Sequence, residues 1–332
     1  MNRKYLLAGV IVAAIAILAA AVAIIAIPSG HTLPGVYIVY DAEKGDLSYT
    51  DSAYRGLFDA QEAMPFTKRE FTSVDHEKLY TLLKGSGAGK PGLVITVGYN
   101  YADDTKRLAG ENQGIRFLAV DQAGTGSSNL KSYEITSYGE SYLAGVLAAS
   151  ATKSRKVGII LGTQSDLLDG FRCGYLDGVE AVDPAIVVDS EYVRDNSMSG
   201  FSDPVRAREI AGEMYHNGTD VVFTVAGFSG TGAIAEAKTV PGRYIIGVES
   251  DQTDRGPSVV LASAVKRVDR VVYTGISEYL NGSFTGGNTV AGLSDGVTGL
   301  VYNPKFAVYN GTVSSWEGKA REAEARYLAT RK

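Results

Sequence analysis

The sequence predicts an α/β protein with two doubly wound lobes that follow a membrane-spanning helix. Short apolar runs alternate with longer amphipathic stretches, which is typical of parallel sheets covered by helices on both faces. The chain has 332 residues, 45% of them hydrophobic, which is enough for about two domains. An uncharged run near the N-terminus adds the membrane-spanning helix.

The N-terminal run covers residues 5–27 and follows Arg3 and Lys4. As a helix it would reach about 34 Å at about 1.5 Å per residue, more than a hydrocarbon core of about 30 Å. Cleavable signal peptides have apolar regions of only about 7–15 residues, so an uncleaved anchor (residues 1–30) is favoured over a cleaved signal. The two basic residues predict a cytoplasmic N-terminus and an extracytoplasmic remainder. Cys173, the only cysteine, lies far from this run, which argues against a bacterial-type lipid anchor.

The segments after the Pro-containing linker 28–34 alternate in type. The predicted strands, short and mostly rich in Val and Ile, are residues 35–40, 93–97, 115–120, 157–161, 220–225 and 243–248. The predicted helices are residues 52–63, 73–83, 103–109, 139–150, 168–181, 203–216 and 232–237. The segment 148–156 is interpreted as a boundary between two similar lobes. The tail, residues 313–332, is charged nearly all round and predicts a solvent-facing helix.

Composition excludes several classes of function. The net charge of −5 offers no basic surplus for nucleic acid. One cysteine excludes a disulfide framework, a thiolate zinc cluster and an iron–sulfur centre, and three histidines leave little for a metal site or a catalytic triad. We therefore expect neither an enzyme nor a cofactor or metal.

Carboxylates recur where the predicted strands end, and parallel sheets bind ligands there. Asp41 and Asp121 follow two strands of the first half, and Glu249 and Asp251 follow the last strand. A single such acid is commonly a turn or N-cap residue. Four acids at three strand ends, with aromatic residues nearby, suit a sugar joined to a planar base. Gly227 opens a glycine-rich turn before a helix, which predicts either an anion or hydroxyl site or a plain tight turn.

Several segments together resemble the basic membrane protein (BMP) family, the purine-nucleoside-binding lipoproteins that serve ABC importers. The similar segments are GDLSYTDSAYRGL (45–57), YGESYLAGVLAA (138–149), KVGII (156–160), GFSDP (200–204), GVESDQ (247–252) and SAVKRVD (263–269). They run in order through most of the soluble chain. The resemblance implies a periplasmic-binding-protein type I fold.

The resemblance also implies roles for individual residues. Asp41 and Asp121 would hydrogen-bond the base, and Tyr49 and Phe201 would stack on its faces. The Gly227 loop, Glu249 and Lys266 would hold the ribose, with Asp251 beside them in the same ligand-binding set. A salt bridge from Lys266 to Asp251 or Glu249 is an alternative that does not exclude this role. Thr50 replaces the family's asparagine, and Glu249 replaces an aspartate, so the base preference stays open.

We therefore expect a membrane-anchored, extracytoplasmic solute-binding protein of an ABC importer that delivers a nucleoside to a permease with a separate ATPase subunit. Lobe 1 would comprise residues 35–150 plus about 253–285, and lobe 2 residues 151–252 plus about 286–312. The chain would cross between them near residues 150, 252 and 285. The alternatives are a ligand-sensing ectodomain for another small polar solute and a nucleoside hydrolase.

Overall fold

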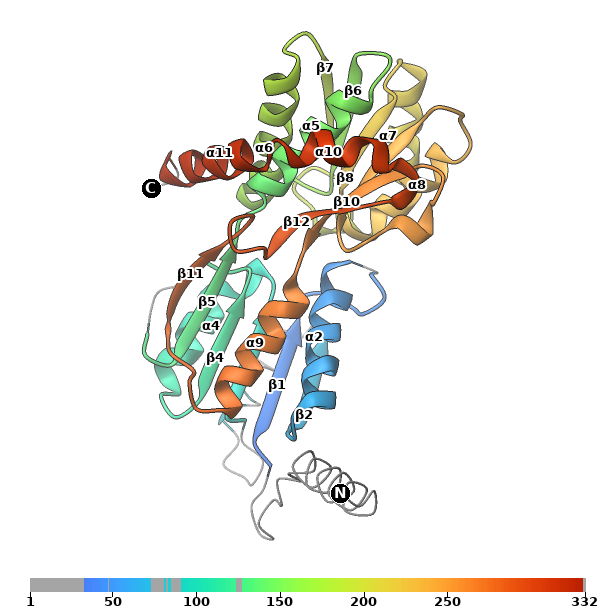
Figure 1. The fold of residues 1–332 in the computed structure, drawn as a ribbon. Coiled ribbons are helices and arrows are strands. Elements are labelled where there is room, and N and C mark those ends of the chain that lie inside the picture. Colours follow the sequence, from blue (N-terminus) through green and yellow to red (C-terminus); the bar gives the residue numbers. More distant parts are fainter. Residues whose placement is uncertain are drawn as a thin grey trace, which may run out of the picture. The chain divides into compact units, whose positions relative to one another are not determined.

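Figure 1 shows the fold as a computed structural model, in which residues 33–46, 48–72, 81, 83–84, 91–123 and 127–330 are described. The predicted membrane helix and most of the predicted helix 73–83 lie outside these residues. None of the helices within them has both the length and the apolar character that a membrane crossing requires.

Lobe 1 is built on a six-stranded parallel sheet in the order β11-β5-β4-β3-β1-β2. Its strands are β1 (Gly35–Tyr40), β2 (Thr67–Thr72), β3 (Leu93–Val97), β4 (Arg116–Val120), β5 (Leu130–Ile135) and β11 (Gly287–Ala291). One face is covered by α2 (Tyr49–Ala63) and α9 (Val268–Leu280), whose apolar residues share a core with β1 and β3. The other face is covered by α4 (Ala102–Glu111). Apolar strands such as β3, buried at every position, form because both faces are covered.

Lobe 2 repeats this plan with the order β12-β10-β9-β8-β6-β7, in which only β12 runs antiparallel to its neighbour. Its strands are β6 (Lys156–Leu161), β7 (Val187–Tyr192), β8 (Val221–Val225), β9 (Tyr244–Glu249), β10 (Val260–Lys266) and β12 (Thr298–Tyr302). One face carries α5 (Tyr138–Ala151), α6 (Asp166–Val182), α10 (Asn310–Ser314) and α11 (Glu317–Thr330). The other carries α7 (Pro204–His216) and α8 (Gly230–Ala237).

Within the described residues, the chain passes between the lobes three times, in three segments that lie side by side (Figure 1). The first crossing, at residues 136–137, is joined to the start of the third by a hydrogen bond from Thr136 N to the oxygen of Ala291 (2.9 Å), the last residue of β11. The second crossing, at residue 267, is joined to the third, residues 292–297, by a bond from Arg267 N to Val297 O (2.8 Å). The third crossing therefore links the other two.

These crossings differ from the predicted ones near residues 150, 252 and 285. Helix α5, predicted to close lobe 1, belongs to the core of lobe 2 because it is apolar on nearly every side and packs against α6. Strand β10 lies in the predicted lobe 1 segment 253–285 but pairs with β9 of lobe 2. Strand β11 lies in the predicted lobe 2 segment 286–312 but pairs with β5 of lobe 1. Neither strand has the Val/Ile-rich pattern on which the strand predictions rested.

The tail, predicted to face solvent along its length, is partly buried. In α11, Ala320 and Ala323 join the core of lobe 2, and Glu324 is only 4% exposed. The Glu324 carboxylate accepts hydrogen bonds from Gly139 N (3.1 Å), in α5 just after the first crossing, and from Leu293 N (3.2 Å), in the third crossing. The charged sequence pattern did not predict that α11 packs beside two of the three crossings.

Candidate functional site

A cavity of about 540 Å³ lies where the carboxyl ends of the two sheets face each other. This volume is within the range of about 300–1,000 Å³ typical of small-molecule sites. Lobe 1 lines it with the ends of β1, β3 and β4 and the start of α2, and lobe 2 with α6, the turn after β8 and the end of β9. The placement follows from the topology, because loops after parallel strands meet at one edge of each sheet.

Most of the predicted site residues line this cavity. They are Asp41, Tyr49, Thr50, Asp121, Phe201, Gly227 and Glu249. The other two, Asp251 and Lys266, line a smaller cavity of about 260 Å³ that shares Glu249 with the first. The structure thus brings the sequence-predicted set together around two adjoining cavities between the lobes.

Two of the acids are held in strained backbone conformations at matching positions of the lobes. Asp121 follows β4 with φ of 61°, and Glu249 ends β9 with φ of 64°. This left-handed region costs a residue with a side chain about 1 kcal/mol or more, and such strain concentrates at functional sites. Gly98 and Gly227, at the ends of the neighbouring strands, also have positive φ (118° and 52°) but without that cost.

Lys266 provides the positive charge between these acids. It is 1% exposed, and its Nζ donates to Asp121 Oδ2 at 2.8 Å, so the ion pair joins lobe 2 to lobe 1. Burial lowers the pKa of Lys266, but attraction to Asp121 and Glu249 outweighs it and holds the pKa above its usual value. Lys266 is therefore charged. The predicted salt bridge to Asp251 or Glu249 was wrong, because Lys266 pairs with Asp121 instead.

The negative charges of the other carboxylates are less well neutralised by nearby positive groups. Burial, reinforced by the charge of Glu249, raises the pKa of Asp41 to about 7. Burial also raises the pKa of Glu249, although Lys266 and a hydrogen bond from Ser48 oppose this. That bond runs from Ser48 Oγ to Glu249 Oε2 (2.6 Å) and also joins the two lobes. A ligand that donates hydrogen bonds would satisfy these acids.

Aromatic and apolar side chains form the rest of the ligand cavity. Tyr49 comes from lobe 1, and Phe201 from lobe 2. Phe171, from α6, was not predicted, and Lys266 Nζ lies 5.4 Å from its ring centroid and 5.7 Å from that of Tyr49. The Thr50 hydroxyl is buried without a hydrogen-bond partner in the described residues.

Other lining residues escaped the sequence analysis. They include Tyr99, Leu168, Met198 and Phe228. Tyr99 directly follows the end of β3, and that position was a usable signal. Phe171 and Leu168 sit in a helix whose apolar residues look like ordinary core, so sequence alone gave no signal for them.

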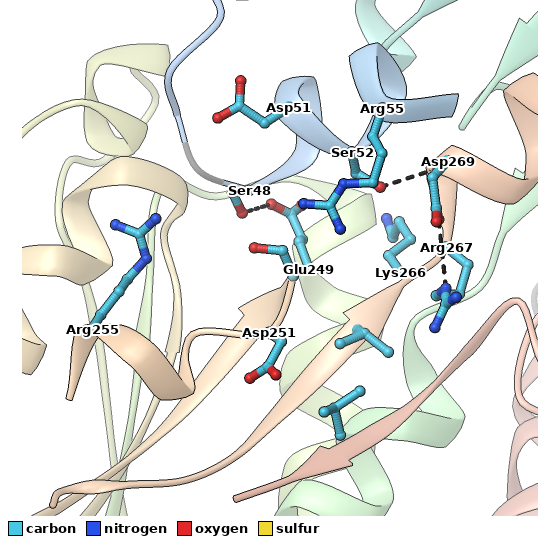
Figure 2. A pocket seen from close by; sticks show the side chains of 13 residues that line it. Ser48, Asp51, Ser52, Arg55, Glu249, Asp251, Arg255, Lys266, Arg267 and Asp269 are labelled. Atoms are coloured by element: carbon cyan, nitrogen blue, oxygen red, sulfur yellow. Dashed lines mark hydrogen bonds and ion pairs between the residues drawn. The ribbon is translucent and has the colours of Figure 1, made fainter. Parts of the chain in front are cut away.

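The smaller cavity is polar and lies between α2 and the loop after β9 (Figure 2). Ser48 and Glu249 stand at its centre, and Arg267 pairs with Asp269 at one side (3.5 Å). No cluster of His, Cys, Asp or Glu within the described part of the chain has an arrangement that could hold a metal ion.

The fold and the cavity between its lobes define a two-lobed solute-binding protein. Residues 34–323 match the Bmp family, described as ABC transporter substrate-binding protein PnrA-like, and the chain belongs to this family. Its relatives include Basic membrane protein A of Borreliella afzelii, 32% identical over 82% of this chain and 84% of that protein. They also include the CD4+ T-cell-stimulating antigen of Listeria monocytogenes, 31% identical over 77% of this chain and 76% of that protein.

The fold is also similar to that of solved structures. A crystal structure of an ABC transporter system solute-binding protein from Aeropyrum pernix K1 superposes with a TM-score of 0.73 and 24% identity. The match covers 90% of this chain and 92% of that one. The resemblance inferred from the sequence motifs is confirmed at the level of the family.

Proposed function

We propose that the chain captures a nucleoside, with a purine base favoured, between its two lobes and delivers it to an ABC permease. The observation that carries this proposal is the charge pattern of the ligand cavity. Three acids, Asp41, Asp121 and Glu249, line it, and the one buried lysine beside them is already paired with Asp121. Ribose hydroxyls and base N–H groups are donors that these carboxylates can accept.

The aromatic lining supports a flat base as part of the ligand. Tyr49 and Phe201 reach the cavity from different lobes, an arrangement suited to sandwiching a ring when the lobes close. In this proposal Asp41 and Asp121 bind the base edge. Glu249, Lys266 and the Gly227 turn bind the ribose, and Asp251 lies beside them in the adjoining cavity.

The same charges predict selection against phosphate. A nucleoside monophosphate would bring a negative group toward several poorly solvated carboxylates, where repulsion is costly. We expect nucleosides to bind at least about a hundredfold more tightly than the matching monophosphates, a difference of about 2.7 kcal/mol. Titration calorimetry with nucleosides, nucleobases and monophosphates measures this. Equal or tighter binding of monophosphates would contradict the assignment of these acids.

The stacking role is tested by removing one ring at a time. Tyr49→Ala and Phe201→Ala should each weaken nucleoside binding about ten- to a hundredfold, because base stacking on an aromatic ring contributes about 1–3 kcal/mol. Phe58, an exposed ring on α2 that does not line the cavity, provides a matched control, and Phe58→Ala should leave affinity unchanged. Lower stability of the empty protein with unaltered affinity would instead identify the two rings as core residues.

We further propose that residues 1–30 anchor the protein in the membrane with the binding lobes outside. Full-length protein should then remain with membranes during alkaline carbonate extraction, and a version that starts at His31 should be soluble and folded. A mature N-terminus near residue 28 in native cells would show that residues 1–27 are a cleaved signal peptide and not an anchor.

Binding of some other polar solute, with no nucleoside bound, would favour a different transport or sensing role. Release of free base from a nucleoside would favour the hydrolase.

A further inference from the structure

The smaller cavity is flanked by the same charged pair on each lobe (Figure 2). Asp51 and Arg55 are four residues apart on α2, so they lie on one face of that helix. Asp251 and Arg255 are also four residues apart, in the loop that follows β9 in lobe 2. One of these acid–arginine pairs therefore comes from each lobe, and both line the cavity between the lobes.

The two arginines have no ion pair in this conformation. No acidic oxygen within the described residues lies within ion-pairing distance of the Arg55 or Arg255 guanidinium group. By contrast, Arg267 in the same cavity is paired with Asp269, two residues along the chain. Burial lowers the pKa of Arg255, and the charges that oppose this belong to Asp51 and Asp46 of lobe 1. The carboxylates that stabilise the charged form of Arg255 therefore belong to the opposite lobe.

The acids are well placed to receive these arginines. Asp51 Oδ1 accepts a hydrogen bond from Gly45 N (2.8 Å), and Asp251 Oδ1 accepts one from Thr253 N (2.9 Å). These bonds tie each carboxylate to its own lobe, so little side-chain freedom is lost when an arginine approaches. The cavity holds acids and bases in equal number, which suits mutual pairing better than a free ion of either sign.

We propose that Asp51 with Arg255, and Asp251 with Arg55, form an electrostatic latch that holds the two lobes closed. The latch shares a boundary with the ligand cavity, because Ser48 and Glu249 lie between them. Closure that narrows the smaller cavity brings both pairs together, and opening separates them. Its effect on ligand affinity rests on the proposed function, but its effect on lobe closure does not.

Lobe closure can be measured without any ligand. The full-length protein can be labelled at one exposed position in each lobe through the changes Cys173→Ser, Lys106→Cys and Lys238→Cys. Single-molecule Förster resonance energy transfer between the two dyes then reports whether the lobes are open or closed. Arg255→Gln should lower the ratio of closed to open molecules about two- to fivefold, as expected for one solvent-accessible ion pair. Arg55→Gln should act in the same direction. The effect should disappear at 1 M salt, where the screening length is about 3 Å.

A double-mutant cycle separates the latch from general surface effects. Asp51→Asn keeps an oxygen for Gly45 N and removes only the charge, so Arg255→Gln combined with Asp51→Asn should open the lobes no further than either change alone. Arg206→Gln is the matched control, because it removes an arginine of α7 in lobe 2 that lines neither cavity and pairs within its own helix, and it should leave closure unchanged. Additive effects of the two changes, an equal effect of Arg206→Gln, or unchanged closure in Arg255→Gln would overturn the latch. None of these outcomes depends on whether nucleosides bind.

Discussion

Glu140→Gln should make the protein more stable than wild type at neutral and alkaline pH but not at pH 4.5. Glu140 lies in the first turn of α5, just after the first crossing, and its side chain is 0% exposed. It is flanked by Glu324 from α11 and by Lys266 at the end of β10. Burial and the charge of Glu324 raise the pKa of Glu140 to about 8, and the attraction of Lys266 does not offset this.

The sign and size of the effect follow from proton linkage. An unfolded chain releases the Glu140 proton near the ordinary pKa of 4.5, whereas the folded protein retains it up to about pH 8. The stability that this group contributes is fully present below pH 4.5 and is lost as pH rises to 8. The difference between the folded and the unfolded pKa of Glu140 corresponds to at most about 5 kcal/mol of stability, because each pKa unit is about 1.36 kcal/mol. Glutamine has nearly the same shape but no charge to bury, so the variant avoids this loss.

Urea unfolding of wild type and variant at intervals from pH 4.5 to 9 measures the difference. The free energy of unfolding of Glu140→Gln relative to wild type should climb across this range. Glu180→Gln, an exposed change on α6, serves as the control and should follow the wild-type curve. If Glu140 were instead ionised and paired with Lys266, Glu140→Gln would be the less stable protein at neutral pH. That result, or parallel curves, would refute the reasoning.

Two further predictions concern the ligand site and the helix packing. With the pKa of Asp41 at about 7, largely through burial and the charge of Glu249, nucleoside affinity should fall up to tenfold per pH unit below 7, and calorimetry should show a weaker pH dependence of affinity in Asp41→Asn. Affinity in wild type that is flat from pH 5.5 to 8.5 would contradict this role. A Cβ on Gly174 would lie 2.2 Å from the backbone oxygen of Tyr138, so Gly174→Ala should cost several kcal/mol in urea unfolding. Gly318→Ala, in a helix with open space around it, should be neutral or stabilising by up to about 1 kcal/mol.

The central strands were predictable because they are buried on both faces. β1 and β3 match their predicted ranges, β8 begins one residue later than predicted, and β9 is shifted by one residue at both ends. The edge strands were missed for the opposite reason. β2 (TKREFT) and β7 (VVDSEY) are only partly covered and carry the charges that exposed edges tolerate. β10 (VLASAVK) is fully buried, but its small residues give a weak apolar signal.

The strand-end acids were predictable for a topological reason, whereas the cavity's shape was not. Asp41, Asp121 and Glu249 could be selected because any parallel sheet brings its carboxyl ends to one edge. Phe171 could not be selected, because nothing in the sequence of a helix tells which apolar residue faces the cavity between the lobes. The first crossing was misplaced because a helix as apolar on nearly every side as α5 fits the core of either lobe equally well by sequence.

The charged residues around the two cavities both affect the opening and closure of the lobes. The Lys266–Asp121 pair is buried and spans the lobes, so opening the cleft must separate or expose it. A buried pair gains little over two hydrated charges, but leaving one partner buried alone is strongly unfavourable. Lys266 also lies at the end of β10, beside the second crossing. Its charge interacts with that of Glu140, which lies near the first crossing. In the proposed function, a ligand that donates hydrogen bonds to Asp41 and Glu249 would stabilise negative charges that Lys266 alone does not neutralise, and it would do so only when both lobes contact it. Under the two proposals, closure is favoured by the ligand in one cavity and by the arginines of the latch in the other.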